Sequence, residues 1–571
     1  MGEKTVAAET PWWKSSVFYE IYMPSFCDGN GDGTGDFQGL TSKLDYLREL
    51  GIGGIWLTPF YPSPRVDNGY DISDYYGVDP VFGTLDDFDH FVREAHRRGI
   101  RVIADLVLNH TSAEHPWFME SRASRTSPKR DWYIWKDAVD GGTPNHWESF
   151  FGGTAWEWDE ATGQYYYHAF AKEQVDLNWA NPEVREAMKE VMSFWLGRGI
   201  DGFRLDVINF LKVSGQFKEN PVTADGEQDH RFDQNQEGIV EAIRDICEFV
   251  RSQNKDVLMV GEVGSEDMEV LRRYSGGDLL DVVFNFNLGS RKELKVHEMF
   301  AELVRMEELH RPEQVPTIFF SSHDMPRHYS RFSSGDDSVD LCTAKLIAAL
   351  MLTAKGVPFI YYGDEIGMRD FVPADIGQMR DIQGLTAYRM AKESGMTEAD
   401  ALAAAILRSR DHSRTPMQWD GSRYGGFSLH GSWIPLGPSS RQVHVQKQWG
   451  SKHSLLEFYR SLIRLRGKHK ALQTGKYTFL KREGECIYYG RQSEEEEIWV
   501  ALNFGDRPCD LNHLAADAAL YRLLLTSKET SADQNRRHSL VIDSFEAAVW
   551  ATTRTITSNE FNFDQVGGSS C

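Results

Sequence analysis

The sequence contains few cysteines, and their arrangement gives no sign of a disulfide framework or a zinc site. Six cysteines are scattered over 571 residues, and none of them has the C-x-x-C spacing with another. Zinc and redox motifs depend on such closely spaced pairs, so the sequence indicates neither. Scattered thiols of this kind are typical of a cytoplasmic protein.

Long apolar runs are also missing from the chain. No segment approaches 18 uninterrupted apolar residues, so no transmembrane helix is predicted. The first residues, M-G-E-K-T-V-A-A-E-T-P-W-W, lack the apolar core of a signal peptide. We therefore expect a cytoplasmic protein without a membrane partner.

The chain has fewer basic residues than acidic ones. The chain has 62 Lys and Arg against 85 Asp and Glu, which gives a formal net charge of −23. No basic patch stands out, so a nucleic-acid partner is not expected. The same charge disfavours an anionic substrate, although a local pocket can override the net charge of a chain. We expect a monomer or a weak homo-oligomer.

Apolar strand segments alternate with amphipathic helical segments along most of the chain. Eight such strands predict an α/β protein with a (β/α)8 TIM barrel. The stretch 199–210 contains the fourth strand. The other seven are expected at 17–22, 54–59, 101–106, 257–263, 282–286, 317–322 and 356–362.

Two departures from this alternation predict further domains. After the third strand, residues 109–179 mix aromatic, glycine and polar residues without a long period, which indicates an inserted excursion domain. From 474 to 553 the pattern becomes one of short alternating strands, which predicts an all-β C-terminal domain, a β-sandwich. The barrel then comprises 1–108 and 180–473, with an insertion at about 366–427. The tail, 554–571, is polar and Gly/Ser-rich and is expected to be disordered.

The stretch G-I-D-G-F-R-L-D-V-I-N-F, 199–210, carries the first candidate catalytic group. Alternation along a strand puts Arg204 and Asp206 on the same face. A neighbouring guanidinium lowers the pKa of a carboxyl group, so we expect Asp206 to be ionised. An ionised aspartate at a strand end can act as a covalent nucleophile, although a purely structural ion pair has the same pattern.

Two more apolar strands end in acidic residues. Glu262 lies at the end of the apolar run V-L-M-V-G-E-V. His323 and Asp324 lie at the end of the run T-I-F-F-S-S-H-D. In a parallel barrel the carboxyl ends of the strands meet on one face, so Asp206, Glu262 and Asp324 should converge. Cleavage of a glycosidic bond needs such a set, one carboxylate as nucleophile and one protonated acid for the leaving oxygen.

A glycine-rich loop near the start of the chain has the oxygen spacing of a calcium site. The loop is C-D-G-N-G-D-G-T-G-D, in which acidic and amide side chains alternate with small residues. It departs from the EF-hand pattern because the twelfth position is Gly39 and no bidentate glutamate closes the loop. A plain turn, with Mg²⁺ or nothing bound, is the alternative. The predicted ligands are Asp28, Asn30, Asp32, the Thr34 carbonyl and Asp36.

Six segments in order resemble those of the alpha-amylase family of glycoside hydrolases, and most closely its oligo-1,6-glucosidase / alpha-glucosidase branch. The resemblance covers roughly residues 12–550. The segments are D-L-V-L-N-H (105–110), Q-V-D-L-N (174–178), G-F-R-L-D-V-I-N-F (202–210), G-E-V (261–263), S-H-D (322–324) and G-V-P-F-I-Y-Y-G-D-E (356–365). The family uses no organic cofactor, and members of this branch often hold a structural calcium in a loop that matches 28–36.

The resemblance implies a role for each matching position. Asp206 would be the nucleophile, Glu262 the general acid/base, and Asp324 a stabiliser of the distorted sugar. Three residues, His110, Arg204 and His323, would bind the same sugar ring. Phe151, Phe170 and Gln174 align with positions that line the sugar site, although either phenylalanine alone would pass for a core residue.

The resemblance also implies a closed end to the sugar site. Asp67 and Tyr70, in the loop D-N-G-Y-D, match residues that close the innermost subsite. Arg414 is the last arginine of the string R-S-R-D-H-S-R-T-P-M-Q-W. It would pair with Asp67, and the pair would close the pocket behind the terminal glucose. Such a wall makes an enzyme act from the chain end. A turn and a surface ion pair are the structural alternatives.

The expected function is an exo-acting retaining alpha-glucosidase that releases glucose from the non-reducing end of short oligosaccharides or disaccharides, with transglucosylation as a second outcome. Val207 follows the nucleophile, and valine at this position goes with alpha-1,6 cleavage in the branch resembled. The alternative is that Val207 is a strand residue that packs inside.

Three other functions remain open. A trehalose-6-phosphate hydrolase would need a cationic phosphate cradle, which the sequence does not locate. A sucrose isomerase would carry an R-L-D-R type loop, which 291–316 lacks. A non-catalytic amylase-like binding subunit would lose the acids.

Overall fold

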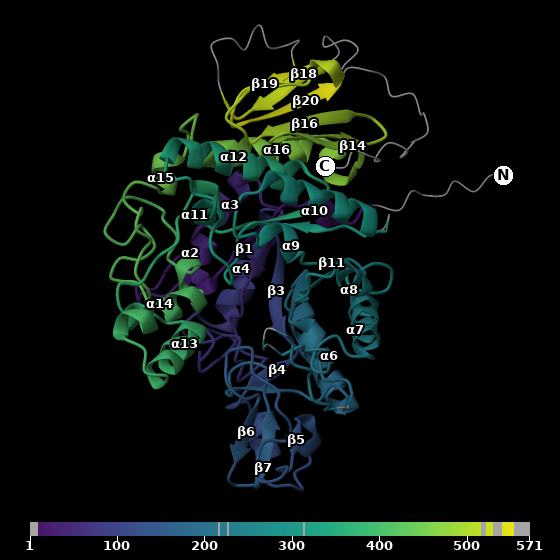
Figure 1. Cartoon of the computed structure of the whole chain (residues 1–571), viewed down its shortest axis with the longest axis vertical. Helices are drawn as coiled ribbons and strands as arrows, with labels where there is room; N and C mark the ends of the chain where they lie inside the picture. Colours follow the sequence, from purple (N-terminus) through teal and green to yellow (C-terminus); the bar gives the residue numbers. More distant parts are fainter. Residues whose placement is uncertain are drawn as a thin grey trace, which may run out of the picture.

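The computed structural model describes residues 10–214, 217–224, 226, 228–311, 314–514, 521–528 and 540–552. The predicted disordered tail, 554–571, lies outside the described residues. Figure 1 shows three regions along the long axis of the molecule: the barrel in the middle, a small sheet of β5, β6 and β7 at the bottom, and the C-terminal strands at the top.

Eight parallel strands form one sheet in the order β11-β10-β9-β3-β2-β1-β13-β12. This confirms the predicted eight-stranded barrel. Each strand is short and almost wholly buried, as expected where helices cover a parallel sheet. The strands are β1 (Phe18–Ile21), β2 (Gly54–Leu57), β3 (Arg101–Val107), β9 (Gly202–Asp206), β10 (Leu258–Gly261), β11 (Val282–Val283), β12 (Thr317–Ile318) and β13 (Val357–Tyr361).

The two end strands of this order, β11 and β12, are joined by the hydroxyl group of Thr317. Its Oγ1 donates to the Val283 carbonyl at 3.1 Å and accepts from the Asn285 N–H at 3.0 Å. Both strands are only two residues long, so a side chain supplies hydrogen bonds that a longer ladder would supply through the backbone. This seam lies between the strands that precede Lys292 and Asp324.

Amphipathic helices surround the sheet. In α4 (Leu85–Arg97), Thr84 and Asp87 form a reciprocal capping box, and the face turned to the sheet buries Phe88 and Phe91. The other helices of the barrel are α1 (Trp12–Ser15), α2 (Phe37–Ser42), α3 (Leu44–Leu50), α6 (Pro182–Gly197), α7 (Ile239–Gln253), α8 (Met268–Arg273), α9 (Phe286–Gly289), α10 (Val296–Leu309), α11 (His328–Arg331), α12 (Asp337–Thr353), α16 (Leu455–Lys468) and α17 (Lys470–Thr474).

Two excursions leave the barrel at the carboxyl ends of its strands. After β3, β4 (His110–Ser112) pairs with β8 (Gln174–Asp176), and between them lie α5 (Pro116–Arg122) and a sheet of β5 (Trp135–Lys136), β7 (Gln164–Tyr167) and β6 (Trp156–Asp159). After β13, α13 (Ile382–Glu393), α14 (Glu398–Arg408) and α15 (Val445–Gln448) form the green part of Figure 1, beside the barrel. Both excursions therefore begin on the face where the acidic residues were expected.

The C-terminal strands form an antiparallel sheet with a small second sheet. The larger sheet has the order β14-β15-β16-β20-β18, and β17 pairs with β19. Tyr488, Leu511, Ile542 and Trp550 pack in one cluster that draws on both sheets. The strands are β14 (Lys476–Glu483), β15 (Cys486–Gln492), β16 (Glu497–Asn503), β17 (Cys509–Asp510), β18 (Tyr521–Thr526), β19 (Val541–Ile542) and β20 (Glu546–Thr552). The residue bounds of the three domains stay a prediction.

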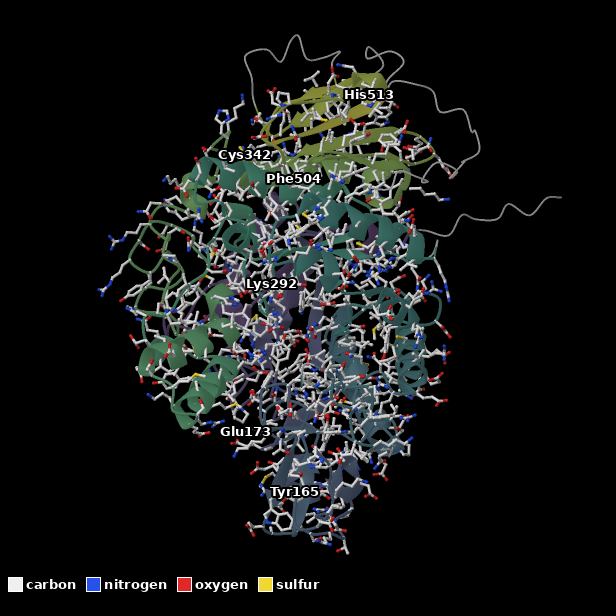
Figure 2. The ribbon with its side chains drawn as sticks, viewed as in Figure 1. Tyr165, Glu173, Lys292, Cys342, Phe504 and His513 are labelled. Carbon is white, nitrogen blue, oxygen red and sulfur yellow. The ribbon has the colours of Figure 1, made fainter. Side chains whose placement is uncertain are left out.

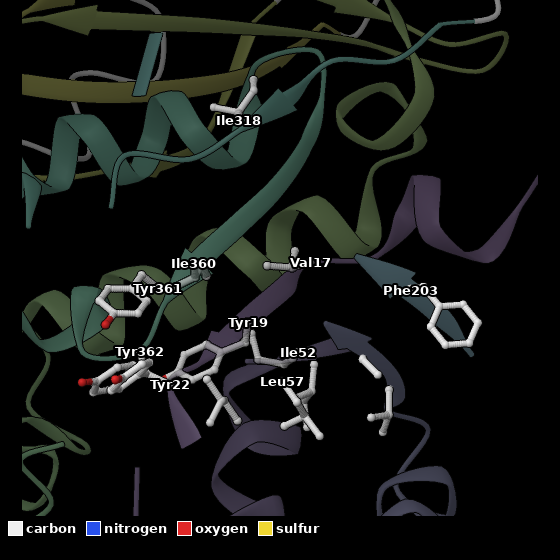
Figure 3. Packing of buried hydrophobic residues seen from close by; sticks show 14 of the residues in the cluster. Val17, Tyr19, Tyr22, Ile52, Leu57, Phe203, Ile318, Ile360, Tyr361 and Tyr362 are labelled. Atoms are coloured by element: carbon white, nitrogen blue, oxygen red, sulfur yellow. The ribbon is translucent and has the colours of Figure 1, made fainter. Parts of the chain in front are cut away.

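The core of the barrel is rich in aromatic side chains near β1 and β13. Tyr19 of β1 and Tyr361 of β13 are fully buried beside Tyr22 and Tyr362, as the close view in Figure 3 shows. The Tyr19 hydroxyl group donates to Glu365 at 2.7 Å, so its polar end is satisfied inside the core. Among the described helices, none is long and apolar enough to cross a membrane.

Candidate active site

The side chain of Arg204 holds two carboxylates next to each other at the end of β9. Its Nη1 donates to Asp206 Oδ1 at 2.6 Å, and its Nη2 donates to Glu262 Oε2 at 2.5 Å. The alternation of β9 places Arg204 and Asp206 on one face, and the parallel pairing of β9 with β10 brings Glu262 beside them. One guanidinium therefore bridges the two acids. The sequence prediction that they converge is correct.

A third carboxylate, Asp105 of β3, accepts hydrogen bonds from the same guanidinium and holds it in place. Arg204 Nη1 lies 2.8 Å from Asp105 Oδ1, and Asp105 Oδ2 also accepts from Trp56 Nε1 at 3.2 Å and from the Tyr70 hydroxyl group at 2.9 Å. Asp105 is fully buried, and it directly faces Arg204 in the register of the two strands. Sequence reasoning did not name Asp105 as a site residue, although it opens the segment D-L-V-L-N-H. The signal was its strand position opposite Arg204.

Burial decides the protonation of the two central acids. It raises the pKa of Asp206 to about 6, although the charge of Arg204 acts in the opposite direction. The expectation that Arg204 would bring the pKa of Asp206 below its usual range is therefore wrong, because desolvation outweighs the ion pair. Burial also raises the pKa of Glu262 to about 7, against Arg204 and with the help of the negative charges of Asp206 and Asp324. The pair thus holds one proton more readily on Glu262, as a general acid requires.

Asp324 lies in a cationic environment instead. Burial alone would raise its pKa, but the charge and hydrogen bond of His323, with the charges of Arg410 and Arg414, hold that pKa well below its usual range. His323 Nε2 is 3.0 Å from Asp324 Oδ2, and its Nδ1 is 2.6 Å from Glu20 Oε1. Burial alone would lower the pKa of His323, but Asp324 and Glu20 raise it to about 9. The unforeseen Glu20, buried on β1, thereby keeps His323 charged.

A cavity of about 780 Å³ opens above these groups. Ten of the thirteen sequence-predicted catalytic and sugar-binding residues line it: Asp67, Tyr70, His110, Phe151, Phe170, Gln174, Asp206, Val207, Glu262 and Asp324. The other three, Arg204, His323 and Arg414, lie beneath the lining, where each contacts at least one of its carboxylates. The cavity can hold more than one sugar ring, since drug-sized ligand pockets begin at roughly 300 Å³.

One end of the cavity is closed by an ion pair that differs from the predicted one. Asp67 Oδ1 pairs with Arg410 Nη2 at 2.5 Å, and not with Arg414. The same Nη2 lies 2.5 Å from Asp381 Oδ1, and the guanidinium carbon of Arg410 lies 5.4 Å from the ring centroid of Phe151. The predicted partner of Asp67 is therefore wrong: Arg410, and not Arg414, pairs with Asp67 and lines the cavity beside it.

Arg414 contacts Asp324 at 2.9 Å and lies 3.8 Å from Asp381, but it does not pair with Asp67. Its Nε donates to the His323 carbonyl at 2.7 Å, and its Nη2 donates to Asp324 Oδ1 at 2.9 Å. The chain makes a 3-10 turn at Asp411–Ser413, with Arg410 immediately before the turn and Arg414 immediately after it. The string R-S-R-D-H-S-R offers three arginines, and spacing alone cannot say which one reaches Asp67.

The remaining predicted sugar-binding residues gather near the closed end. Gln174 Nε2 donates to Asp67 Oδ2 at 3.1 Å. His110 Nε2 is 3.0 Å from the Tyr70 carbonyl, and burial lowers the pKa of His110 to about 4, so this imidazole is neutral. Phe170 packs 5.4 Å from His110. This end offers hydrogen-bonding groups and one aromatic wall, the combination that recognises a sugar ring.

Val207 has a left-handed backbone conformation, with φ 37° and ψ 46°. This conformation is uncommon for a β-branched residue, and it ends the strand immediately after the nucleophile. As a result the Val207 side chain lines the cavity, and the Val207 N–H lies 3.3 Å from Glu262 Oε2. Val207 is therefore not a strand residue that packs only inside the protein, which was the alternative to a position at the sugar site.

The glycine-rich loop folds its own N–H groups onto its acidic side chains. Asp28 accepts from Gly31 and Gly33, at 2.6 Å and 2.9 Å. Asp36 caps the first turn of α2 and also accepts from the N–H groups of Gly29 and Asn30. Across the described ranges, no three His, Cys, Asp or Glu side chains are grouped so that they could share a metal ion. The carboxylate, amide and carbonyl oxygens of the loop suit calcium chemically, and the ion stays a prediction.

A parallel barrel that presents two bridged carboxylates and a third beside them is typical of retaining glycoside hydrolases. The family model for the alpha amylase catalytic domain matches residues 20–475. An oligo-1,6-glucosidase of Halalkalibacterium halodurans is 38% identical over 556 residues, 95% of this chain and 99% of that protein. A trehalose-6-phosphate hydrolase of Bacillus subtilis is 38% identical over 567 residues, 96% and 99% of the two chains.

Solved structures agree with these relatives. A mutant of a trehalulose synthase, crystallised with Tris, aligns with a TM-score of 0.87 at 34% identity, over 95% of this chain and 100% of that one. A trehalose-6-phosphate hydrolase mutant of Bacillus licheniformis aligns with a TM-score of 0.85 at 35% identity, with the same coverage. The chain belongs to the alpha-amylase family of glycoside hydrolases.

Proposed function

We propose that this protein is an exo-acting, retaining alpha-glucosidase that releases glucose from the non-reducing end of short alpha-glucosides, with a preference for alpha-1,6 linkages of the isomaltose type. The observation that carries the proposal is the guanidinium of Arg204, which hydrogen-bonds to both Asp206 and Glu262 and so holds the two carboxyl groups side by side. In retaining enzymes the two carboxyl groups lie close together on either side of one glycosidic bond, whereas inverting enzymes leave room for a water.

The protonation of the two acids supports their division of labour. Asp206 attacks the anomeric carbon, and the new bond forms as the bond to the leaving oxygen breaks. Glu262, whose raised pKa of about 7 keeps a proton available, protonates that oxygen. Glu262 then takes a proton from water, and the resulting hydroxide displaces Asp206 and releases glucose. A second sugar in place of water gives transglucosylation.

The lasting negative charge of Asp324 has a separate role in this proposal. It stays ionised because His323, Arg410 and Arg414 surround it. A carboxylate that does not titrate cannot donate a proton near neutral pH. It can hold the hydroxyl groups of the distorted ring and stabilise the positive charge that develops at the anomeric carbon. His110, neutral and buried, offers a hydrogen bond to the same ring.

The closed end of the cavity supports exo action. The buried pair of Asp67 and Arg410 leaves the glucose at the base of the cavity without an open path beyond it. A longer glucoside can therefore enter only with its non-reducing end first. The oligo-1,6-glucosidase among the relatives supports the linkage preference, and Val207 in the cavity lining gives it a structural basis.

The other functions compatible with the sequence differ in their products. A trehalose-6-phosphate hydrolase and a trehalulose synthase are both among the similar proteins. Purified protein should be incubated in parallel with isomaltose, maltose, sucrose, trehalose and trehalose 6-phosphate, with glucose release and product anomer followed by proton NMR. The proposal expects α-glucose first, and fastest from isomaltose. Initial β-glucose, or rearrangement of sucrose as the main reaction, would contradict it.

The proposal also includes a cellular compartment, an oligomeric state and a structural calcium ion. The five described cysteines are free thiols, which supports a reducing, cytoplasmic compartment. We infer a monomer or weak homo-oligomer, because every group of the mechanism comes from one chain. The oxygen-rich loop 28–36 supports a structural calcium ion, far in sequence from the catalytic acids.

A further inference from the structure

The barrel contains a buried glutamate, Glu20 of β1, which does not line the catalytic cavity. Figure 2 shows side chains filling the middle of the molecule, where the barrel lies, and Glu20 is only 2% exposed. Its Oε1 lies 2.6 Å from the ring Nδ1 of His323 and accepts the backbone N–H of the same residue at 3.1 Å. Glu20 therefore holds both the backbone and the ring of a histidine that is 303 residues away in the sequence.

The ring of His323 has an acid beside each of its two nitrogens. Nδ1 faces Glu20, and Nε2 lies 3.0 Å from Asp324 Oδ2. Because Glu20 Oε1 already accepts the backbone N–H of His323, this oxygen acts as an acceptor and the ring nitrogen beside it acts as a donor. The Nδ1 nitrogen therefore carries a proton.

The hydroxyl group of Tyr70 indicates that the other ring nitrogen carries a proton as well. It lies 2.7 Å from His323 Nε2, and it donates its own hydrogen to Asp105 Oδ2 at 2.9 Å. The Tyr70 oxygen can then only accept from Nε2, as can the carboxylate of Asp324. A neutral imidazole has a proton on one nitrogen only, so donors on both sides require the charged imidazolium. The hydrogen-bond pattern thus gives His323 a positive charge inside the protein.

Charges around His323 decide whether this buried ring keeps its proton. The titratable and charged groups that face it are Glu20, Tyr22, Tyr70, Asp105, Arg204, Glu262, Asp324 and Arg414. Burial raises the pKa of both tyrosines, so they stay neutral. Burial also lowers the pKa of His323, whereas Asp324 and Glu20 raise it. Asp324 belongs to the proposed chemistry and Glu20 does not, so the contribution of Glu20 can be removed alone.

We propose that Glu20 is a positioning residue of the glycosidase site, which holds His323 as a charged donor towards Asp324 and towards the sugar ring. The inference rests on the proposed function, because His323 matches a sugar-binding position of the family. Without the charge of Glu20 the ring can be neutral in either of two tautomers, and only one of them donates to Asp324. The charge-assisted hydrogen bond that holds Asp324 would then be weakened or lost.

NMR titration of the His323 ring in the intact protein tests the charge of this ring without any turnover. In wild-type protein the titration should report the raised pKa of His323, about 9, and the loss of the signal in His323→Gln identifies it. Glu20→Gln keeps the shape and an acceptor oxygen but removes the charge, so the midpoint should fall by about 1–3 pH units. Glu365→Gln is the matched control and should leave the midpoint unchanged, because Glu365 is equally buried and binds Tyr19 and Tyr46 instead.

The pH dependence of kcat/KM on isomaltose separates positioning from mere structural support. In wild-type protein the alkaline limb should follow the loss of one proton from Glu262, so its logarithmic slope is about −1 between the pKa of Glu262, about 7, and that of His323, about 9. In Glu20→Gln both groups lose protons in this range, so the slope should approach about −2. Glu365→Gln should keep the wild-type slope.

Three results would overturn the inference. The first is a wild-type midpoint at or below about 6.5, the ordinary value for histidine, and this measurement does not depend on the folding of any variant. The second is a midpoint that Glu20→Gln leaves unchanged, and the third is a kcat/KM that falls by the same factor at every pH. If the wild-type protein hydrolyses no alpha-glucoside, the proposed function fails, and the NMR titration still decides whether Glu20 keeps His323 charged.

Discussion

The carboxylate of Asp67 and the guanidinium of Arg410 form a buried ion pair, with Arg410 Nη2 at 2.5 Å from Asp67 Oδ1. The two residues come from the loop after β2 and from the segment after α14, so the pair joins two distant parts of the chain. Arg410 also pairs with Asp381 and lies 3.3 Å from Asp324. This pair is thus both the end wall of the cavity and a link to the catalytic acids.

Arg410→Ala should destabilise the protein strongly. The substitution leaves Asp67 and Asp381 buried without their main cation, and breaking a buried pair in this way costs about 3–5 kcal/mol. The midpoint of urea unfolding measures the effect. Arg423→Ala, at an exposed arginine of the same excursion, serves as the control and should change stability by less than about 0.5 kcal/mol. Equal midpoints for the two variants would show that Arg410 does not hold the wall together.

Asp206→Asn and Glu262→Gln should each nearly abolish turnover and leave the fold intact. Each acid acts in the transition state, and loss of general acid–base work alone costs about 10²-fold or more. The exposed Glu160→Gln is the matched control for removal of a carboxylate charge. We would compare kcat on isomaltose and the circular dichroism of all three variants. A variant of either acid that retains more than about a tenth of wild-type kcat would disprove its assignment.

The pH dependence of kcat/KM should be bell-shaped. The nucleophile must be ionised, so activity rises as the pH increases through the raised pKa of Asp206, about 6. The general acid must be protonated, so activity falls as the pH increases through the raised pKa of Glu262, about 7. Because the two acids interact, the limbs report the pair rather than single residues. A profile that stays flat from pH 5 to 9 would contradict this pairing of roles.

The barrel and its acidic strand ends could be predicted from the sequence because both follow from local patterns. Alternation fixed the shared face of Arg204 and Asp206, and parallel strands bring their carboxyl ends to one side. Glu20 and Asp105 escaped prediction, since a buried acid within an apolar strand has no local signature of its role. What identifies Asp105 is its register opposite Arg204.

Long-range partners were the part that sequence could not supply. The segment 408–414 offers three arginines, and the structure gives each a different position: Arg408 at the mouth, Arg410 at the wall and Arg414 beneath Asp324. The end of α14 and the 3-10 turn at Asp411–Ser413 decide this distribution. The pKa of Asp206 was likewise misjudged, because burial depends on the whole fold and a neighbouring arginine does not.

Calcium should raise the melting temperature without changing the catalytic constants. The predicted ion would bind the oxygen atoms of loop 28–36, and a ligand that binds only the folded state stabilises it by mass action. Asp32→Asn should weaken the effect, because it removes one negative charge from an exposed position of the loop. Melting curves in millimolar calcium and in chelator provide the measurement. Identical melting temperatures in both solutions would argue that the loop is a plain turn.

Val207 is expected to set the preference for alpha-1,6 over alpha-1,4 linkages. Its left-handed conformation brings a branched apolar side chain to the cavity, where it gives shape and no hydrogen bond to the second sugar. Thr has nearly the same shape and the same β-branch, so Val207→Thr keeps the backbone strain and adds only a hydroxyl group. The ratio of kcat/KM for isomaltose to that for maltose should therefore shift towards maltose, by about 1–3 kcal/mol at most. Val207→Ile, which lengthens the side chain without a polar atom, is the control and should leave no new preference for maltose. If the wild-type protein already cleaves maltose with the higher kcat/KM, the linkage assignment fails, whereas the glucosidase assignment does not.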